Sequence, residues 1–232
     1  MLSKIKEKIK TLLKDMVFTL SPEYFHKFKL LNFERNTLPK QFVRHMNQLT
    51  KADIVIDVGA NVGLVSECLA RRGSKVISFE PNVAAFSTLE MVAAKFKNIE
   101  ARNVAVGTKN KIVKLYLHKD SASTEDDLSQ ASSLLSNKPN VSTKFFEEVQ
   151  ERDFAEFSHS LKSPIELLKI DIEGFEIELI NHLLDRNALD HVNKVYVETH
   201  ERKFTELTDL TKKLKVRIKA KGYENKFFYD WH

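Results

Sequence analysis

The stretch DIVIDVGANVG, residues 53–63, decides the fold of this chain. It begins as a short apolar run rich in β-branched residues, which is typical of a buried parallel strand. It ends at Gly59 and Gly63, and apolar side chains recur at helical spacing after the second glycine. A strand, a glycine turn and a helix in this order predict an open α/β sheet that offers a ligand its turn and a helix N-terminus.

The spacing of the glycines argues against a dinucleotide. The G-x-G-x-x-G fingerprint has glycines at its first, third and sixth places, whereas Asn61 and Leu64 stand at the third and sixth places here. Asp57 lies two positions before the first glycine, where its carboxylate would repel a pyrophosphate and attract an ammonium group. These features disfavour a nicotinamide-dependent oxidoreductase.

A second acidic residue suggests the rest of the ligand. The next apolar run, residues 75–79, ends in Glu80, where a carboxylate can accept hydrogen bonds from both hydroxyls of a ribose. A ligand with an amino-acid end, a ribose end and no phosphate fits S-adenosylmethionine. The alternative is a strand and turn with a structural role only.

Composition places the chain among ordinary soluble globular proteins. Of its residues, 42% are hydrophobic and 30% are charged. A length of 232 residues is sufficient for one sizeable α/β domain. The single cysteine, Cys68, excludes an internal disulfide and predicts a cytoplasmic protein. The net charge of +5 comes without the mixture of aromatic and basic residues typical of RNA-binding modules, so we expect no nucleic-acid partner.

Residues 2–20 predict an amphipathic basic helix, because apolar residues recur at helical spacing between lysines. Lysines interrupt any apolar core of a signal peptide, and the segment is too polar to span a bilayer. Packing on the domain or on a second copy in a homodimer is favoured, and contact with a membrane surface is the alternative. We expect an N-terminal helical extension over residues 1–50 and the ligand-binding domain over residues 51–232.

The remaining pattern predicts a doubly wound, mostly parallel sheet, because strands and helices alternate at short intervals. An inserted loop, residues 119–143, interrupts the alternation and is rich in serine and aspartate. The expected strands are 53–58, 75–79, 99–106, 112–118, 144–152, 166–170, 194–197 and 223–229, and the expected helices are 22–38, 40–49, 62–72, 83–96, 175–186 and 205–221.

Acidic residues and one histidine follow the strands of this predicted sheet. Ligands bind beyond the carboxyl ends of the strands in such a fold. Burial of several acids costs free energy unless they meet hydrogen-bond donors or positive charge. A hydroxyl-rich ligand would supply the donors, and a sulfonium cation would supply the charge. Simple capping of the strand ends is the alternative. The set comprises Asp57, Glu80, Asp171, Glu173, Glu198 and His200.

Six motifs between about residue 53 and residue 200 make the chain similar to one known family. They are DVGANVG (57–63), FEPN (79–82), NVAVG (103–107), SSL (132–134), LKIDIEGFE (168–176) and VETH (197–200). Together they resemble the FkbM-like S-adenosylmethionine-dependent O-methyltransferases. The resemblance implies a Rossmann-like class I fold with core strand order 3-2-1-4-5. It also implies methyl transfer to a hydroxyl of a sugar in a glycan, glycolipid or polysaccharide precursor. Methylation of a secondary metabolite and a non-catalytic S-adenosylmethionine-binding module are the alternatives.

The resemblance also implies a role for each matching residue. The methionine end of the cofactor would lie against Asp57, Gly59, Ala60, Asn61 and Gly63, the ribose against Glu80, and the adenine against Pro81, Asn82, Asn103, Val104 and Ala105. The substrate would contact Ser132, Ser133 and Glu198, and the catalytic residues would be Asp171, Glu173 and His200.

The strand-end set leaves the proton acceptor open. One hypothesis makes His200 the general base, oriented by Glu198 or Glu173, with Asp171 positioning the acceptor hydroxyl. Asp171 is the rival base, and a structural His200 is the third alternative. The same four residues could form an oxygen-rich Mg²⁺ site, but they also suit hydrogen bonds to hydroxyls without a metal. The sequence-based prediction includes no metal.

Overall fold

The computed structural model describes residues 22–118, 141–200, 207–229 and 231, and the chain divides into two compact units, residues 1–44 and 45–232. Helix α2 (Pro22–Asn36) belongs to the first unit, and α3 (Lys40–Met46) spans the boundary. The predicted helix at residues 2–20 lies outside the described residues, as do Ser132 and Ser133. Among the described helices, none is both long enough and apolar enough to cross a membrane.

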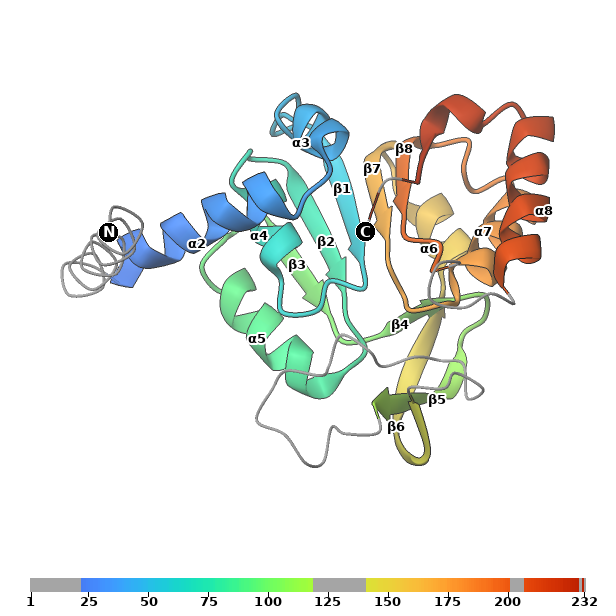
Figure 1. The fold of residues 1–232 in the computed structure, drawn as a ribbon, viewed down its shortest axis with the longest axis horizontal. Coiled ribbons are helices and arrows are strands. Elements are labelled where there is room, and N and C mark those ends of the chain that lie inside the picture. Colours follow the sequence, from blue (N-terminus) through green and yellow to red (C-terminus); the bar gives the residue numbers. More distant parts are fainter. Residues whose placement is uncertain (1–21, 119–140, 201–206, 230, 232) are drawn as a thin grey trace, which may run out of the picture. The chain divides into compact units, whose positions relative to one another are not determined.

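A six-stranded parallel sheet forms the centre of the second unit (Figure 1). Its order, β3-β2-β1-β7-β8-β9, confirms the predicted doubly wound core, because its first five strands follow the order 3-2-1-4-5 along the chain. The strands are β1 (Ile54–Val58), β2 (Lys75–Phe79), β3 (Ile99–Arg102), β7 (Ile165–Ile170), β8 (Val192–Val197) and β9 (Phe227–Phe228).

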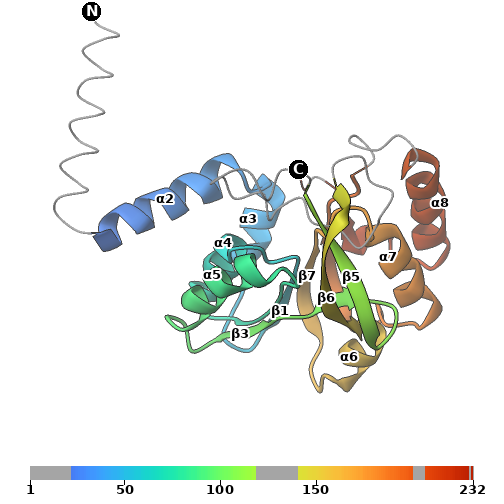
Figure 2. The same cartoon turned by 90° about the horizontal axis from the view of Figure 1, so that it is seen from below.

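The order of the strands reverses direction between β1 and β7. Right-handed crossovers that run in opposite directions place their helices on opposite faces of a sheet. Figures 1 and 2 show α4 and α5 beside the β1–β3 half, and α6, α7 and α8 beside the β7–β8 half. The reversal between β1 and β7 is where this fold binds ligands. The helices are α4 (Leu64–Ala70), α5 (Val83–Ala93), α6 (Phe154–Ser160), α7 (Glu176–Asp185) and α8 (Leu207–Ala220).

A second, three-stranded sheet contains β4 (Ala105–Gly107), β5 (Lys111–His118) and β6 (Val141–Asp153) in the order β4-β6-β5. Its two long strands, β5 and β6, pair antiparallel. The prediction of one strand over residues 99–106 is wrong, because the chain leaves the parallel sheet at Asn103. The Asn103 side-chain amide donates to the backbone oxygens of Glu80 and Pro81, at 2.9 and 3.0 Å, and so fixes this exit.

Other parts of the chain also differ from the prediction. Residues 141–143 belong to β6 instead of the inserted loop, and helix α6 was not predicted. The last strand is limited to Phe227–Phe228, because Glu224–Lys226 forms a 3₁₀-helix. The Phe228 ring stacks on Tyr196 with 4.7 Å between ring centroids, so even this short strand is held against β8.

The two faces of the parallel sheet bury different chemistry. One face is apolar, and its Ile56, Val58 and Ile170 side chains belong to a core that includes residues of α7 and α8. The other face contains a polar layer, because Asp57 of β1 lies in register with Lys169 of β7. The Lys169 Nζ lies 3.3 Å from the Asp57 Oδ1, and both side chains are almost completely buried. A buried charge of this kind requires its partner.

The turn after β1 packs against the backbone after β7. Gly59 has a φ of +75°, and a Cβ atom added to it would overlap the backbone oxygen of Asp171. The Asp171 N–H donates to the Val58 oxygen at 3.1 Å on the same side. A side chain at position 59 would therefore separate the two turns that border the site.

Replacement of Gly59 by alanine should destabilise the domain more than the same change at Gly222. Both glycines have a φ of +75°, but no atom of the described residues other than its chain neighbours lies within 4 Å of a Cβ placed on Gly222. Gly222→Ala should therefore lower the free energy of unfolding by about 1 kcal/mol, because alanine is strained in the left-handed backbone conformation. Gly59→Ala should lower the free energy of unfolding by about 2 kcal/mol more, because the Asp171 backbone must move to make room for the new Cβ atom. Urea unfolding of both variants measures the difference, and equal costs would contradict the close approach of the two turns.

Replacement of Lys169 by methionine should cost about 3–5 kcal/mol of unfolding free energy, because Asp57 would stay buried without its cation. The double variant Asp57→Asn, Lys169→Met should recover most of that loss. Lys194→Met is the matched control, since Lys194 pairs with Glu166 across β8 and β7 in a partly exposed position and should lose at most about 1 kcal/mol. Urea unfolding of the four proteins tests the pair, and no recovery in the double variant would refute it.

Candidate functional site

The candidate site lies at the carboxyl ends of β1, β2, β7 and β8, beside the reversal of strand order. Asp57 lies near the end of β1, and the turns after the strands carry the other acidic residues and the histidine that the sequence analysis singled out. The structure brings Asp171, Glu173, Glu198 and His200 together in one cluster. It places Asp57 and Glu80 beside the neighbouring turn, where both act electrostatically on Lys169.

The glycine turn after β1 is fixed to the end of β2. The N–H groups of Gly59 and Ala60 both donate to the Phe79 oxygen at 3.0 Å, and the Asn61 N–H donates to Glu80 Oε2 at 2.8 Å. Gly63 begins helix α4 with a φ of 86° and no side-chain cap. The Gly63 N–H donates to the Ala60 oxygen at 2.9 Å, so the turn already uses four of its N–H groups within the protein and offers a ligand mainly its shape.

Asp57 is fully buried below this turn. Its Oδ2 accepts a hydrogen bond of 2.7 Å from the Ser66 hydroxyl, and its Oδ1 faces the Lys169 ammonium. The Lys169 Nζ also donates to the Gly59 oxygen at 2.6 Å, and the negative groups around it raise its pKa despite its burial. Lys169 was missed as a site residue, although a lysine inside the apolar run 165–170 is a signal that could have identified it.

Glu80 closes the other side of the turn. Its Oε1 accepts from the Asn82 N–H at 2.9 Å, while Oε2 accepts from Asn61. Burial raises the pKa of Glu80 to about 7, although these two N–H groups and the charge of Lys169 act in the opposite direction. Each carboxylate oxygen can accept a second hydrogen bond, so the residue keeps the acceptor capacity that two ribose hydroxyls need.

The residues predicted beside the adenine have local roles in the fold. The Asn82 Oδ1 accepts from the Ala85 N–H at 2.9 Å and caps α5. Asn103 is exposed and fixes the end of β3, Val104 is partly buried, and Ala105 is buried within the three-stranded sheet. Contact of these residues with adenine stays a prediction, as does that of Pro81.

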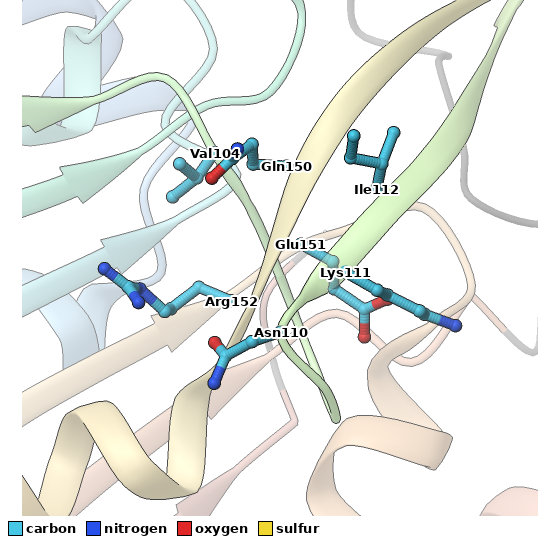
Figure 3. A pocket seen from close by; sticks show the side chains of 7 residues that line it. All are labelled: Val104, Asn110, Lys111, Ile112, Gln150, Glu151 and Arg152. Carbon is cyan, nitrogen blue, oxygen red and sulfur yellow. The ribbon is translucent and has the colours of Figure 1, made fainter.

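A cavity of about 240 Å³ lies on the three-stranded sheet (Figure 3). Figure 3 shows Glu151 next to Lys111, and these two side chains form an ion pair of 3.4 Å. The Glu151 Oε1 also accepts from the Thr108 N–H at 2.7 Å. Among the predicted site residues that the structure describes, only Val104 lines this cavity, so the cavity is separate from the strand-end cluster. Its lining comprises Val104, Asn110, Lys111, Ile112, Gln150, Glu151 and Arg152.

His200 is at the centre of the strand-end cluster, with a completely buried side chain. Its Nε2 lies 3.5 Å from Glu173 Oε2, 3.5 Å from Glu198 Oε1 and 3.9 Å from Asp171 Oδ1. Burial alone would lower the pKa of His200, but the neighbouring carboxylates of Glu173 and Glu176 outweigh it and raise the pKa to about 10. The imidazole is therefore protonated at neutral pH in the protein without ligands.

Glu176 orients this histidine from behind. Its Oε1 lies 3.0 Å from His200 Nδ1, and its carboxylate accepts from the N–H groups of Ile172 and Gly174 at 2.9 Å each. The side chain is fully buried. Sequence reasoning missed Glu176 as a site residue, because an acidic residue in the first turn of a helix is usually explained by the helix dipole.

Asp171 is the member of the cluster that is most open to solvent, with 26% of its side chain exposed. Its Oδ2 lies 3.5 Å from Lys169 Nζ, whereas its Oδ1 faces His200. Glu173 and Glu198 are less exposed, at 17% and 16%. Chemically, this arrangement can accept several hydrogen bonds from hydroxyl groups or hold a cation.

S-adenosylmethionine, the cofactor that the family resemblance implies, fits the hydrogen-bond acceptors and the negative charge of this site. Glu80 retains capacity for two hydroxyls, and the acidic edge suits a cationic sulfonium. The Lys169 ammonium, by contrast, is almost completely buried and bound to the Gly59 oxygen, so it does not offer a diphosphate an exposed positive charge.

Comparison with known proteins gives relatives that are named as methyltransferases. Methyltransferase 1 of Beauveria bassiana is 29% identical over 62% of this chain and 63% of its own length. The ribosomal RNA small subunit methyltransferase A of Thermotoga maritima is 34% identical over 24% of this chain and 20% of its own length. Its counterpart in Thermotoga petrophila is 32% identical over 28% of this chain and 25% of its own length. The chain thus spans less than two thirds of the length of each of these relatives.

The family comparison covers the parts of the chain that build the site. The model of the methyltransferase FkbM domain matches residues 57–224, from the end of β1 to the 3₁₀-helix before β9. This span contains Glu80, Asp171 and His200 together with the strands that position them. The chain therefore belongs to the FkbM methyltransferase family.

Proposed function

We propose that this protein is an S-adenosylmethionine-dependent O-methyltransferase that modifies a hydroxyl group of a sugar in a glycan, glycolipid or polysaccharide precursor. The observation that carries the proposal is the cluster of carboxylates around His200, which lies next to the Glu80 turn at the same edge of the sheet. Carboxylates accept hydrogen bonds from hydroxyls, and a sugar presents several hydroxyls close together.

The cofactor would bind along the turn after β1. Glu80 would accept hydrogen bonds from its ribose hydroxyls, and residues 59–63 would surround its methionine end. When bound, S-adenosylmethionine supplies an electrophilic methyl group on a sulfonium. Because Lys169 neutralises Asp57, we assign Asp57 the role of holding the turn through this ion pair instead of contacting the amino group directly.

Asp171 is the proposed acceptor of the hydroxyl proton. It is the most exposed carboxylate of the cluster, so an incoming hydroxyl can reach it, whereas the His200 side chain is completely buried. As the oxygen–methyl bond formed and the methyl–sulfur bond broke, leaving S-adenosylhomocysteine, the hydroxyl proton would pass to the Asp171 carboxylate. His200 would hold the surrounding carboxylates in place, which replaces the earlier hypothesis that His200 is the base.

Methyl transfer to sugar hydroxyls tests the proposal. Radiolabelled S-adenosylmethionine and a panel of methyl glycosides and lipid-linked sugars should give a labelled product whose new methyl group is on oxygen, as identified by mass spectrometry and NMR. Asp171→Asn should lower kcat about 10²–10⁴-fold, because proton transfer contributes that much to such reactions. Its affinity for S-adenosylhomocysteine, measured by calorimetry, should stay near that of the wild type.

The matched control for Asp171→Asn is Asp185→Asn, because Asp185 lies at the end of α7 in an exposed ion pair with Arg217. This variant should transfer methyl groups at the wild-type rate. Binding of NAD in preference to S-adenosylhomocysteine would overturn the proposed cofactor. Transfer at the wild-type rate in Asp171→Asn would remove this residue from proton transfer.

Affinity for S-adenosylhomocysteine should rise with pH between 6 and 8. Ribose hydroxyls donate best to an ionised carboxylate, and the pKa of Glu80 is raised to about 7 with Lys169 and Asp57 as the charged groups that face it. If only the ionised form binds, affinity should increase about tenfold over this range. Calorimetry at several pH values measures the change.

Two variants isolate the contribution of Glu80 to this pH dependence. Glu80→Gln should bind more weakly and with a flat profile, because it has no group that titrates near neutrality. Glu100→Gln, at an exposed carboxylate of β3 that pairs with Arg102, should keep the wild-type slope. A slope that persists in Glu80→Gln would contradict the role of Glu80 at the ribose.

A further inference from the structure

We infer that Asp171, Glu198 and His200 form a binding site for a divalent first-row transition-metal cation at the edge where the acceptor hydroxyl is proposed to bind. The fold already holds the turns that carry these three residues, so the cation should bind without the methyl donor or the acceptor. The sequence-based prediction included no metal, and the structure adds the geometry that changes this expectation.

The three side chains converge at a distance that suits a cation. One ligand atom from each lies within 4.8 Å of the other two. The Nε2 atom of His200 is 3.9 Å from Asp171 Oδ1 and 3.5 Å from Glu198 Oε1. Ligands bound at about 2.1 Å to a six-coordinate cation are separated by about 3 Å when adjacent and about 4.2 Å when opposite. Small side-chain movements would therefore complete the coordination.

The second, independent observation is the unpartnered Nε2 atom of His200. It is buried and makes no hydrogen bond within the described part of the chain, yet it faces the two carboxylates. Buried polar atoms without a partner are rare in folded proteins and often mark a missing ion or water. A cation at this position would bind the nitrogen directly, and the Nε2 proton would pass to solvent.

The other ring nitrogen is arranged as in metal-binding histidines. Nδ1 lies 3.0 Å from the Glu176 carboxylate and 3.2 Å from the Glu198 backbone oxygen, and either oxygen can accept its proton in a hydrogen bond. Metal-binding histidines almost always donate this second N–H to a carboxylate or a carbonyl, which directs the lone pair of the first nitrogen at the metal. The N–H groups of Ile172 and Gly174 hold Glu176 and so fix the ring from behind.

The charge around the site also favours a divalent cation. Four carboxylates lie within 4 Å of one buried imidazole ring. The ammonium of Lys169 reaches only Asp171 among them. Such a concentration of negative charge needs positive charge or hydrogen-bond donors, and a divalent cation would supply more positive charge than the protonated His200 ring that it replaces in this role. The four carboxylates belong to Asp171, Glu173, Glu176 and Glu198.

The ligand set indicates which cations fit. Carboxylates suit Mg²⁺ and Mn²⁺, whereas imidazole suits Zn²⁺, Fe²⁺ and Ni²⁺. One imidazole with two carboxylates therefore favours a first-row transition metal over Mg²⁺, which was the ion considered from the sequence alone. Mn²⁺ accepts both kinds of ligand, and its paramagnetism makes it a direct probe of binding.

The role of the cation, but not its binding, rests on the proposed function. A divalent cation lowers the pKa of an oxygen ligand bound to it. At this position it would weaken the O–H bond of the acceptor hydroxyl and assist the transfer of the proton to the carboxylate cluster. Binding itself can be measured without the methyl donor or any acceptor.

The test is a titration of the whole chain with Mn²⁺, followed by the electron paramagnetic resonance signal of the free ion. We expect one Mn²⁺ bound per chain. His200→Gln and Glu198→Gln should each weaken binding at least tenfold, because each removes a ligand. Glu176→Gln should weaken it about 10–100-fold through the orientation of the ring. The wild-type chain with Mg²⁺ as competitor should release Mn²⁺ only at a large excess of Mg²⁺.

His182→Gln provides the matched control, because His182 Nε2 also pairs with a carboxylate, Asp153, at 3.0 Å, but outside the cluster. It should bind Mn²⁺ as the wild type does. Thermal unfolding of every variant checks that it is folded. If His200→Gln does not fold, Glu198→Gln still tests the site, because the Glu198 side chain is partly exposed.

Two outcomes overturn the inference: no stoichiometric binding of Mn²⁺, or unchanged binding in both His200→Gln and Glu198→Gln. Calorimetry with S-adenosylhomocysteine on the same samples separates this result from the proposed function. Binding of S-adenosylhomocysteine without Mn²⁺ binding refutes the metal site alone. Mn²⁺ binding without S-adenosylhomocysteine binding supports the metal site and counts against the proposed cofactor.

Discussion

The buried ion pair between Asp57 and Lys169 is the interaction on which the rest of the site depends. The two residues lie opposite each other on β1 and β7, the strands between which the sheet reverses its order. Lys169 also donates to the Gly59 oxygen, so one ammonium connects the β7 strand to the turn after β1. Because an unpaired charge at this depth would cost several kcal/mol, the pair fixes the relative position of the two turns. The candidate cofactor turn and the acidic cluster are thereby held together.

This pair also changes the electrostatic interpretation of the glycine turn. The sequence suggests that Asp57 presents a negative charge to the ligand, but Lys169 neutralises that charge inside the core. The negative charge that a ligand meets comes instead from Glu80 and from the cluster around His200. A strand-end carboxylate can therefore serve the architecture of a site without contacting the ligand, and only its neighbours on adjacent strands distinguish the two roles.

The fold was predictable where local chemistry determines it. Apolar runs of β-branched residues gave the central strands, and the glycines after β1 gave the turn. The division of the predicted strand at residues 99–106 was not predictable, because it depends on bonds from Asn103 to a turn more than twenty positions earlier. Lys169 and Glu176 were missed for a related reason. Their roles depend on register and on side-chain direction, and neither follows from sequence spacing alone.

Backbone conformation shows why the acidic cluster persists without a ligand. Asn61, Glu173 and His200 all have left-handed φ angles, of 49°, 57° and 51°, and each belongs to a turn that follows a strand at this edge. A non-glycine residue in this region costs about 1–2 kcal/mol, so the surrounding contacts must maintain it. For His200 and Glu173 those contacts include the Glu176 carboxylate and the N–H groups that hold it. The fold itself therefore imposes the gathering of like charges, which leaves a site that is stabilised when a hydroxyl-rich or cationic ligand binds.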